Sequence, residues 1–167
     1  MTEGPESCEG QMPQPVAEHG KIQELVGTWN TVGKFYMGGP DAPPMESRGK
    51  EVVESVGGFW VTGHFTSDFM GQPFVGRSSM GFDPWKQEYI STWIDSMSAA
   101  TFFMRGKRNG NVITSECDGV DPGTGNPTRY RTTEEEISPD ERHFSMFMIL
   151  PDGNAMKLFD MEYTRER

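Results

Sequence analysis

Turn signals recur along this chain at intervals of about ten residues, and this spacing limits the folds that the chain can adopt. The segments between the signals alternate apolar and polar side chains, which indicates strands with one buried face. Short strands at such regular spacing are typical of an all-β sandwich or barrel. The signals are Gly38-Gly39-Pro40, Gly57-Gly58, Met70-Gly71, Asp83-Pro84, Asn109-Gly110, Asp121-Pro122-Gly123, Pro139-Asp140 and Asp152-Gly153-Asn154.

The alternation predicts the strands Thr28–Met37, Glu46–Ser55, Phe59–Ser67, Gln72–Phe82, Glu88–Ser96, Ala99–Arg108, Asn111–Asp118, Thr128–Ile137, Arg142–Leu150 and Ala155–Arg165. No segment is long and periodic enough for the helix that joins parallel strands, so neighbouring strands must be antiparallel. A meander of this length closes most simply on itself, because closure removes unpaired edges. We therefore predict an all-β, up-and-down antiparallel β-barrel of about ten strands with room for an internal cavity.

The N-terminal part of the chain has a different pattern. Residues 1–15 are rich in Glu, Gly, Pro and Gln and cannot bury enough apolar surface to offset the entropy lost on ordering, so we expect a disordered tail. From Val16 to Leu25 the sequence predicts a short N-terminal helix, with Ile22, Leu25 and Val26 on one side, that would cover the barrel mouth. Residues 16–167 suit a single domain with one core.

The charge and the apolar content of the chain exclude several classes of partner. A net charge of −10 argues against nucleic acid, because few cations are available to neutralise phosphates. No apolar run approaches the roughly 18 residues of a membrane span, so no membrane partner is expected. The first residues have neither a basic start nor an apolar block, so we expect no signal peptide and a cytoplasmic location.

The segment Gln72 to Ser96 is predicted to be a hairpin, because Asp83-Pro84-Trp85-Lys86 favours a turn. If Phe82 pairs with Glu88, one face is mainly apolar and collects Phe74, Met80, Ile90 and Ile94. The opposite face collects a polar and aromatic set, namely Arg77, Tyr89, Trp93 and Asp95. This set is either an inward patch that orients and stacks on a ligand or a group of exterior cross-strand pairs.

Gly27-Thr28-Trp29 at the start of the first strand resembles the G-x-W signature of lipocalins and their calycin relatives. In that superfamily an Arg from the last strand closes over the Trp, and the resemblance implies this structural role for Trp29 and Arg165. The alternation agrees with this interpretation, because it places both residues on the inner face of their strands.

From about residue 22 onward the chain also resembles a bacterial family known as domain of unknown function 1579. The matching segments are Leu25-Val26-Gly27-Thr28-Trp29, Gly57-Gly58-Phe59, Gly76, Gly81-Phe82-Asp83, Tyr89, Thr92-Trp93-Ile94-Asp95-Ser96 and Met161-Glu162-Tyr163-Thr164-Arg165. The family usually has Tyr at the position of Phe82. The resemblance implies a calycin-like β-barrel close to fatty-acid-binding proteins and nitrobindins, and it implies no established activity.

Cofactor and metal chemistry find little support in the sequence. A haem site of the nitrobindin kind would need an inward His, but the alternation places His64 and His143 on outward faces, and the last strand has no His. The cysteines and histidines do not cluster with zinc-ligand spacing. The run Glu134-Glu135-Glu136 has the form of a solvated strand end. We therefore expect no cofactor, no metal site and no catalytic residues.

The leading hypothesis is non-catalytic binding of a small, apolar or amphipathic molecule inside the barrel, with Arg77, Tyr89, Trp93 and Asp95 as contacts. A second hypothesis is an enzyme that uses the same cavity, with Asp95 as general base and Arg77 as an anion clamp. Two further hypotheses are a haem-binding protein like nitrobindin and an interaction protein that forms a homodimer through one barrel face.

Overall fold

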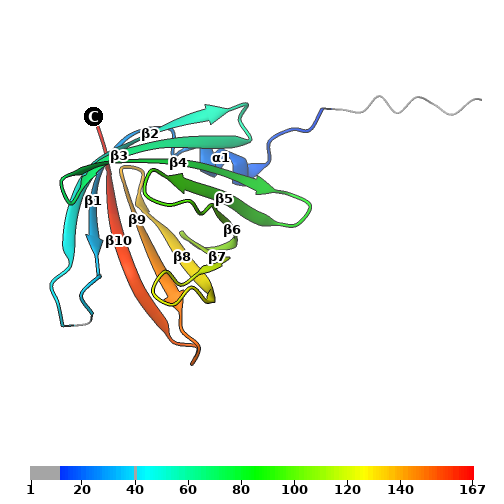
Figure 1. The fold of residues 1–167 in the computed structure, drawn as a ribbon. Helices are drawn as coiled ribbons and strands as arrows, with labels where there is room; N and C mark the ends of the chain where they lie inside the picture. Colours follow the sequence, from blue (N-terminus) through cyan, green and yellow to red (C-terminus); the bar gives the residue numbers. More distant parts are fainter. Residues whose placement is uncertain (1–11, 40) are drawn as a thin grey trace, which may run out of the picture.

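The computed structural model describes residues 12–39 and 41–167 and shows a closed barrel of antiparallel strands (Figure 1). The elements are α1 (Ala17–Gln23), β1 (Gly27–Phe35), β2 (Met45–Val56), β3 (Trp60–Phe69), β4 (Gln72–Asp83), β5 (Glu88–Asp95), β6 (Phe102–Asn109), β7 (Val112–Val120), β8 (Pro127–Ser138), β9 (Glu141–Ile149) and β10 (Ala155–Arg165). Each strand pairs with its neighbours in sequence, and β1 pairs with β10 to close the sheet. The predicted ten-stranded up-and-down barrel with a short N-terminal helix is confirmed.

Two parts of the sequence-based prediction need separate comment. The predicted disordered tail, residues 1–15, falls mainly on residues 1–11, which lie outside the described part of the chain. Within the described part, no helix has the length and apolar character needed to cross a membrane.

The predicted start of β6 is wrong, because the strand begins at Phe102 rather than at Ala99. Side chains in the preceding loop bond the backbone there: Asp95 Oδ1 accepts from the N–H of Met97 at 2.9 Å, and Ser98 Oγ accepts from the N–H of Ala100 at 3.0 Å. Such local bonds compete with the hydrogen-bond ladder of a strand. The β5–β6 connection is consequently longer than the alternation predicts.

The predicted register of the β4–β5 hairpin is also wrong. Phe82 pairs with Tyr89, and Asp83 remains in the strand opposite Glu88. The Asp83 carboxylate accepts from the N–H groups of Trp85 and Lys86, at 2.9 and 3.1 Å, while the loop runs on to Gln87, whose φ is +54°. The turn is therefore one residue further along than predicted, and a slip of one residue moves every side chain of a strand to the other face.

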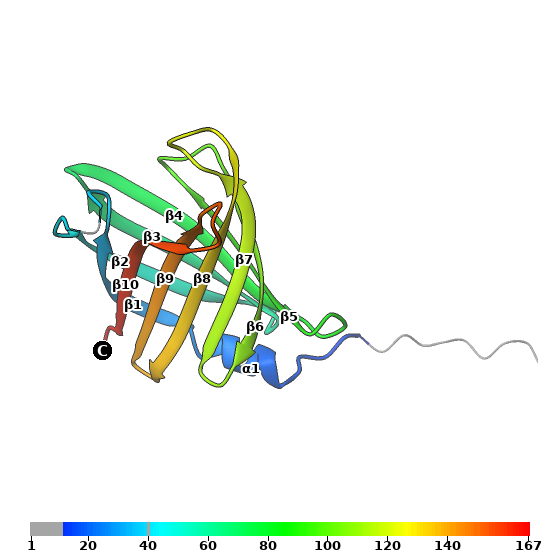
Figure 2. The same ribbon diagram turned by 90° about the horizontal axis from the view of Figure 1, so that it is seen from below.

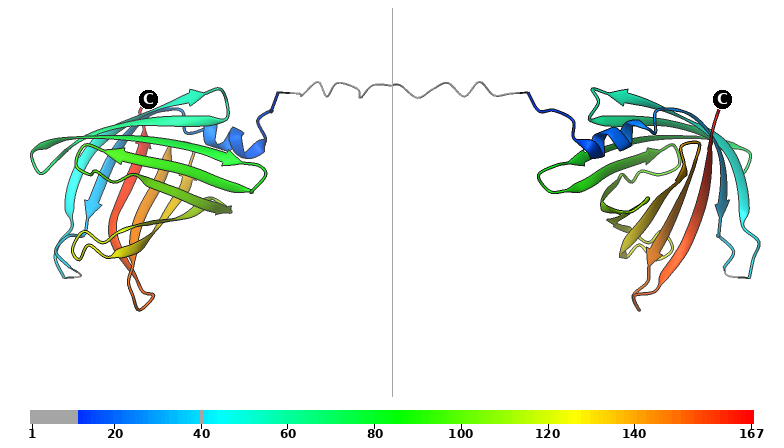
Figure 3. Two further views of the ribbon diagram at one scale, coloured as in Figure 1. Left: turned by 45° about the vertical axis from the view of Figure 1, so that its right-hand side comes forward. Right: turned by 180° about the vertical axis from the view of Figure 1, so that it is seen from behind.

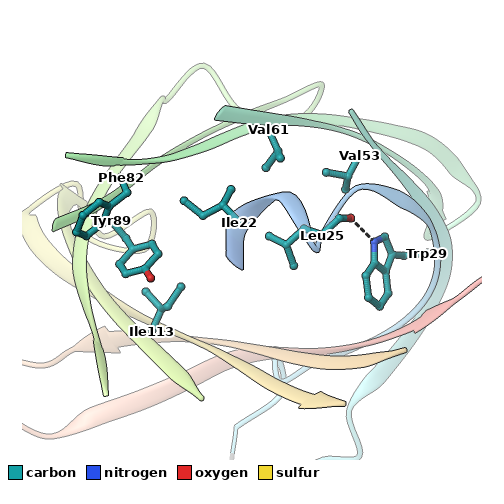
Figure 4. Close-up of a cluster of buried hydrophobic side chains, with 8 residues drawn as sticks. All are labelled: Ile22, Leu25, Trp29, Val53, Val61, Phe82, Tyr89 and Ile113. Atoms are coloured by element: carbon teal, nitrogen blue, oxygen red, sulfur yellow. Dashed lines mark hydrogen bonds between the residues drawn. The ribbon is translucent and has the colours of Figure 1, made fainter. Parts of the chain in front are cut away.

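Helix α1 closes one end of the barrel. It packs against β3 and β4 (Figure 2) and lies near the hairpin that joins β4 to β5 (Figure 3). Figure 4 shows Ile22 and Leu25 directed into the barrel among side chains of several strands. These residues form one buried cluster that consists of Ile22, Leu25, Trp29, Val53, Val61, Phe82, Tyr89 and Ile113.

Buried His19 fixes the start of this helix. Its Nδ1 accepts a hydrogen bond from the N–H of Val16 at 2.9 Å, so its Nε2 carries the proton that is donated to the carbonyl of Phe82 at 3.0 Å. The His19 ring also lies edge-on to Phe59, with ring centroids 5.2 Å apart. The imidazole thus ties α1 to the end of β4, a role that no sequence pattern indicates.

Trp29 and Arg165 hold the end of the helical segment to the last strand. The indole of Trp29 donates to the carbonyl of Leu25 at 2.8 Å, and the Arg165 guanidinium carbon lies 4.2 Å from the centroid of the Trp29 ring. Arg165 also donates to the carbonyls of Glu24, Val26 and Pro139, at 2.6, 2.8 and 3.1 Å. Gly27 leaves the space that the Arg165 side chain occupies. A Cβ at this position would lie 2.6 Å from Arg165 Nη1, and the φ of +139° is one that other residues rarely adopt.

We predict that Arg165→Met lowers the free energy of unfolding by about 2–4 kcal/mol, because several charge-assisted hydrogen bonds to backbone carbonyls are lost. Urea unfolding followed by tryptophan fluorescence measures the change. Arg167→Met is the matched control, since the Arg167 side chain is 92% exposed. Equal unfolding free energies for the two variants would contradict the closing role of Arg165.

Candidate functional site

A cavity of about 450 Å3 lies inside the barrel. It extends from Leu25 beneath α1 to Phe69 and Met97 near the opposite end of the strands. Aromatic rings make up much of its wall, among them Phe35, Phe65, Phe74, Trp93, Phe102 and Phe159. Several methionines also line it, including Met80, Met104, Met146 and Met161. The interior is therefore a largely apolar space with adaptable side chains.

Trp93 on β5 is the central aromatic residue of this wall. Its ring stacks on Phe74 with centroids 6.4 Å apart and an interplanar angle of 18°, and it meets Phe65 edge-on. The indole N–H donates to Asp95 Oδ2 at 2.9 Å, which fixes the orientation of the ring. Gly76 on β4 leaves the necessary space, because a Cβ at that position would collide with the Trp93 ring.

Asp95 lines the cavity, but both of its carboxylate oxygens have hydrogen-bond partners within the protein. Oδ2 accepts from Trp93 and Oδ1 accepts from the N–H of Met97. Asp95 therefore acts on the geometry of Trp93 and of the β5–β6 loop.

The other two predicted contacts lie elsewhere. Tyr89 is 3% exposed and belongs to the cluster beneath α1, where its ring packs on Phe82 and its hydroxyl accepts from Arg108 at 3.1 Å. Arg77 points out of the barrel, opposite Ile94 on β5, and its side chain is solvent-exposed. The prediction that Arg77 shares a face with Trp93 and Asp95 is wrong, because the hairpin register differs by one residue. An enzyme site built from Asp95 and Arg77 is excluded for the same reason.

One part of the cavity wall is strongly polar, and sequence reasoning missed it. Glu51 on β2, Glu134 on β8 and Arg142 on β9 all line the cavity, and their side chains are only 7%, 12% and 8% exposed. Arg142 Nη2 donates to Glu51 Oε2, and Arg142 Nη1 donates to Glu134 Oε1 at 3.0 Å. We call these three residues the buried charge cluster.

Aromatic rings surround the guanidinium of this cluster. The Arg142 guanidinium carbon lies 3.8 Å from the centroid of the Tyr163 ring and 4.9 Å from that of Trp29. A cation over an aromatic face is attracted by the ring quadrupole. The cluster is thereby connected through Trp29 to the closing contact of Arg165.

Burial is the largest influence on the pKa of Glu134 in this cluster. It raises the pKa of Glu134 above its usual value; Arg142 opposes this shift, and the nearby carboxylates of Glu51 and Glu136 add to it. Burial also raises the pKa of Tyr163, and the negative charge of Glu51 adds to that effect. Tyr163 therefore stays a neutral hydroxyl at physiological pH.

The positions of the histidines bear on the haem hypothesis. His19 is bound between α1 and β4, His64 is exposed on the outside of β3, and His143 lies on the outer side of β9, 3.7 Å from Asp160. None of the three lines the cavity. The described residues also contain no group of three or more His, Cys, Asp or Glu arranged to hold a metal ion.

Cys117 is buried in a second apolar cluster, together with Met104, Tyr130, Met146 and Met148. Burial and the neighbouring charge of Asp118 raise the pKa of its thiol to about 11. A thiol that stays protonated at neutral pH is a poor nucleophile. The cysteine therefore contributes to packing.

The closed barrel is consistent with the family that the sequence resembles. The chain belongs to the family described as "Protein of unknown function (DUF1579)", whose model matches residues 14–165. No curated protein matches the chain significantly.

Solved structures support the fold. The crystal structure of Rv2717c from M. tuberculosis is 18% identical, covers 92% of this chain and 100% of its own, and superposes with a TM-score of 0.66. A fluorescence-activating beta barrel designed de novo is also 18% identical, with coverage of 87% and 96% and a TM-score of 0.50. At these identities the similarity concerns the barrel architecture alone.

We predict that Glu134→Gln leaves the free energy of unfolding at neutral pH unchanged or raises it, since the amide oxygen still accepts from Arg142 and a buried negative charge is removed. Because folding raises the pKa of Glu134, a cost of ionisation is present at neutral pH; it falls as the pH drops below the folded-state pKa and is gone below the unfolded-state pKa. Any advantage of the variant should therefore shrink on acidification. Urea unfolding at several pH values measures this difference.

Glu51→Gln is the matched comparison, because it removes the other carboxylate of the same cluster. We expect this variant to be less stable than the wild type by about 1–3 kcal/mol, since the charge of Glu51 stabilises the Arg142 guanidinium more than that of Glu134 does. A loss of the same size for Glu134→Gln at neutral pH would contradict the assignment of an unfavourable charge to Glu134.

Proposed function

We propose that this protein binds a small, largely apolar molecule inside the barrel. The observation that carries the proposal is the cavity of about 450 Å3, which falls within the range of known ligand pockets, roughly 300–1,000 Å3. Close packing normally fills a protein interior with few voids larger than a water molecule. A cavity of this size in a closed barrel therefore favours an occupant over a core that serves packing alone.

The character of the wall supports an apolar body for this ligand. The hydrogen bond to Asp95 and the stacking on Phe74 fix the orientation of the Trp93 ring, which therefore offers a rigid aromatic surface. Rigid side chains lose little conformational entropy when a ligand binds. The methionines beside this ring adapt their shape to the ligand. In this proposal Trp93 is the main contact, Asp95 positions it, and Tyr89 supports the closed end.

The proposed entrance lies beside the β5–β6 loop, opposite α1. Met97 and Ser98 both line the cavity and are exposed to solvent, Met97 by 50%. The closed end offers no comparable path, because Ile22 and Leu25 fill it and are 1% and 9% exposed. The buried charge cluster lies toward the closed end, next to Trp29. The end of the ligand that enters first would therefore contact this cluster.

We predict that the neutral dye N-phenyl-1-naphthylamine binds the wild type with enhanced, blue-shifted fluorescence, and that Ser78→Phe weakens this binding at least about tenfold. Ser78 lines the cavity, so a phenyl group there occupies ligand space. Fluorescence titration gives both dissociation constants.

Arg77→Phe is the matched control, because the same side chain is then placed on the neighbouring outward position of β4. We expect it to bind the dye like the wild type. Circular dichroism verifies that both variants remain folded. Equal dye binding by the wild type and folded Ser78→Phe would argue against binding inside the barrel.

A further inference from the structure

The buried charge cluster presents more hydrogen-bond acceptors than donors to the cavity. Arg142 uses both terminal nitrogens on Glu51 Oε2 and Glu134 Oε1. Among the described residues, neither Glu51 Oε1 nor Glu134 Oε2 receives a hydrogen bond. Arg142 Nε is also without a partner there, but it is enclosed by protein atoms rather than open to an occupant. These two carboxylate oxygens are therefore free to accept hydrogen bonds from a ligand.

The formal charge of the cluster is also unbalanced. Two carboxylates and one guanidinium sum to a net charge of −1 when all three are ionised. An uncompensated charge in a low-dielectric site is costly, because water no longer solvates it. Burial raises the pKa of Glu134, and the second carboxylate of the cluster, Glu51, adds to this effect. A positive charge in the adjacent cavity would remove the charge imbalance.

Further acceptors lie beside Glu51. Ser78 Oγ and Glu51 Oε1 both approach the backbone of Gly63, where a Cβ would lie 2.5 Å from the carboxylate oxygen and would collide with the hydroxyl. Gly63 thus allows a hydroxyl and a carboxylate to face the cavity side by side. Phe65 is the register partner of Glu51 and also lines the cavity, so an aromatic ring adjoins the same place. Carboxylate, hydroxyl and aromatic groups together form a suitable environment for an ammonium group.

We propose that the ligand is a cationic amphiphile, with an ammonium group against Glu51 and Glu134 and an apolar body against Trp93 and Phe74. This inference rests on the proposed function and specifies its ligand class. A carboxylate head, in contrast, would meet two like charges and a guanidinium that already forms an ion pair with both of them. A neutral alcohol would bind without either the attraction or the repulsion.

Displacement of bound N-phenyl-1-naphthylamine by decylamine, decanol and decanoate tests the head group, because the three compounds share one alkyl chain. All three are used at about pH 7.5 below their micellar concentrations, where the amine is protonated and the carboxylate ionised. We expect decylamine to displace the dye at concentrations at least about tenfold lower than decanoate, with decanol between them. Displacement by decanoate at equal or lower concentrations than decylamine would overturn the cationic head group while leaving the cavity proposal intact.

Charge variants test the location of the head group. Glu134→Gln should reduce the preference for decylamine over decanol at least about threefold, since it removes one of the two anionic partners. Glu162→Gln removes the same charge from the barrel exterior, where the Glu162 side chain is 60% exposed, and should leave the preference unchanged. An unchanged preference in folded Glu134→Gln would overturn the assignment of the ammonium group to this cluster.

Failure of the proposed function gives a different result. If the wild type binds neither the dye in the titration nor decylamine in isothermal calorimetry, both proposals are overturned. If the dye binds and the three alkyl compounds compete equally, the barrel binds apolar molecules and the head-group inference alone is overturned.

Discussion

The pairing of β1 with β10 is the contact on which the rest of this structure depends, because closure decides which side chains face the interior. Trp29 lies opposite Arg165 and Thr31 lies opposite Tyr163, so the two end strands present the same alternation to the inside. Arg165 then binds the carbonyls of Glu24 and Val26, which follow α1, and these bonds hold Leu25 in place at the closed end of the barrel. Strand closure, helix docking and the closed end of the cavity are therefore parts of one arrangement.

The architecture could be predicted from the sequence because turn residues and alternation are local signals. All ten strands are present, and the pairing of Trp29 with Arg165 follows from alternation and the G-x-W resemblance. The β4–β5 face could not be assigned with the same method, because a single residue in the turn decides it. The φ of Gln87 is +54°, a conformation that Gln seldom adopts, and this residue extends the loop beyond the predicted turn. The alternation therefore places Arg77 on the same face as Trp93, whereas the structure places the two on opposite faces.

The buried charge cluster escapes sequence reasoning for a different reason. Glu134 stands in an acidic run that resembles a solvated strand end, and charged residues are rarely buried unless they are paired. The available signal is the position of each residue in the strand alternation. Glu51 lies on the same face of its strand as buried Val53, and Arg142 lies on the same face as Met146 and Met148. The alternation alone therefore predicts that these side chains point inward. It does not predict that they pair, because the pairing joins β2, β8 and β9, and contacts between distant strands can be recognised only in the closed barrel.

The position of the cluster has consequences for both stability and binding. A buried ion pair contributes little net stability, because desolvation offsets much of the attraction, and well-packed apolar residues often serve as well. The cluster is therefore better explained by what it presents to the cavity than by what it adds to folding. An apolar wall allows many ligands of suitable size, and discrimination among them comes from a few polar groups that penalise the wrong head group. In the proposed binding mode, Trp93 and its neighbours set the size and shape of the ligand, whereas Glu51 and Glu134 select its charge.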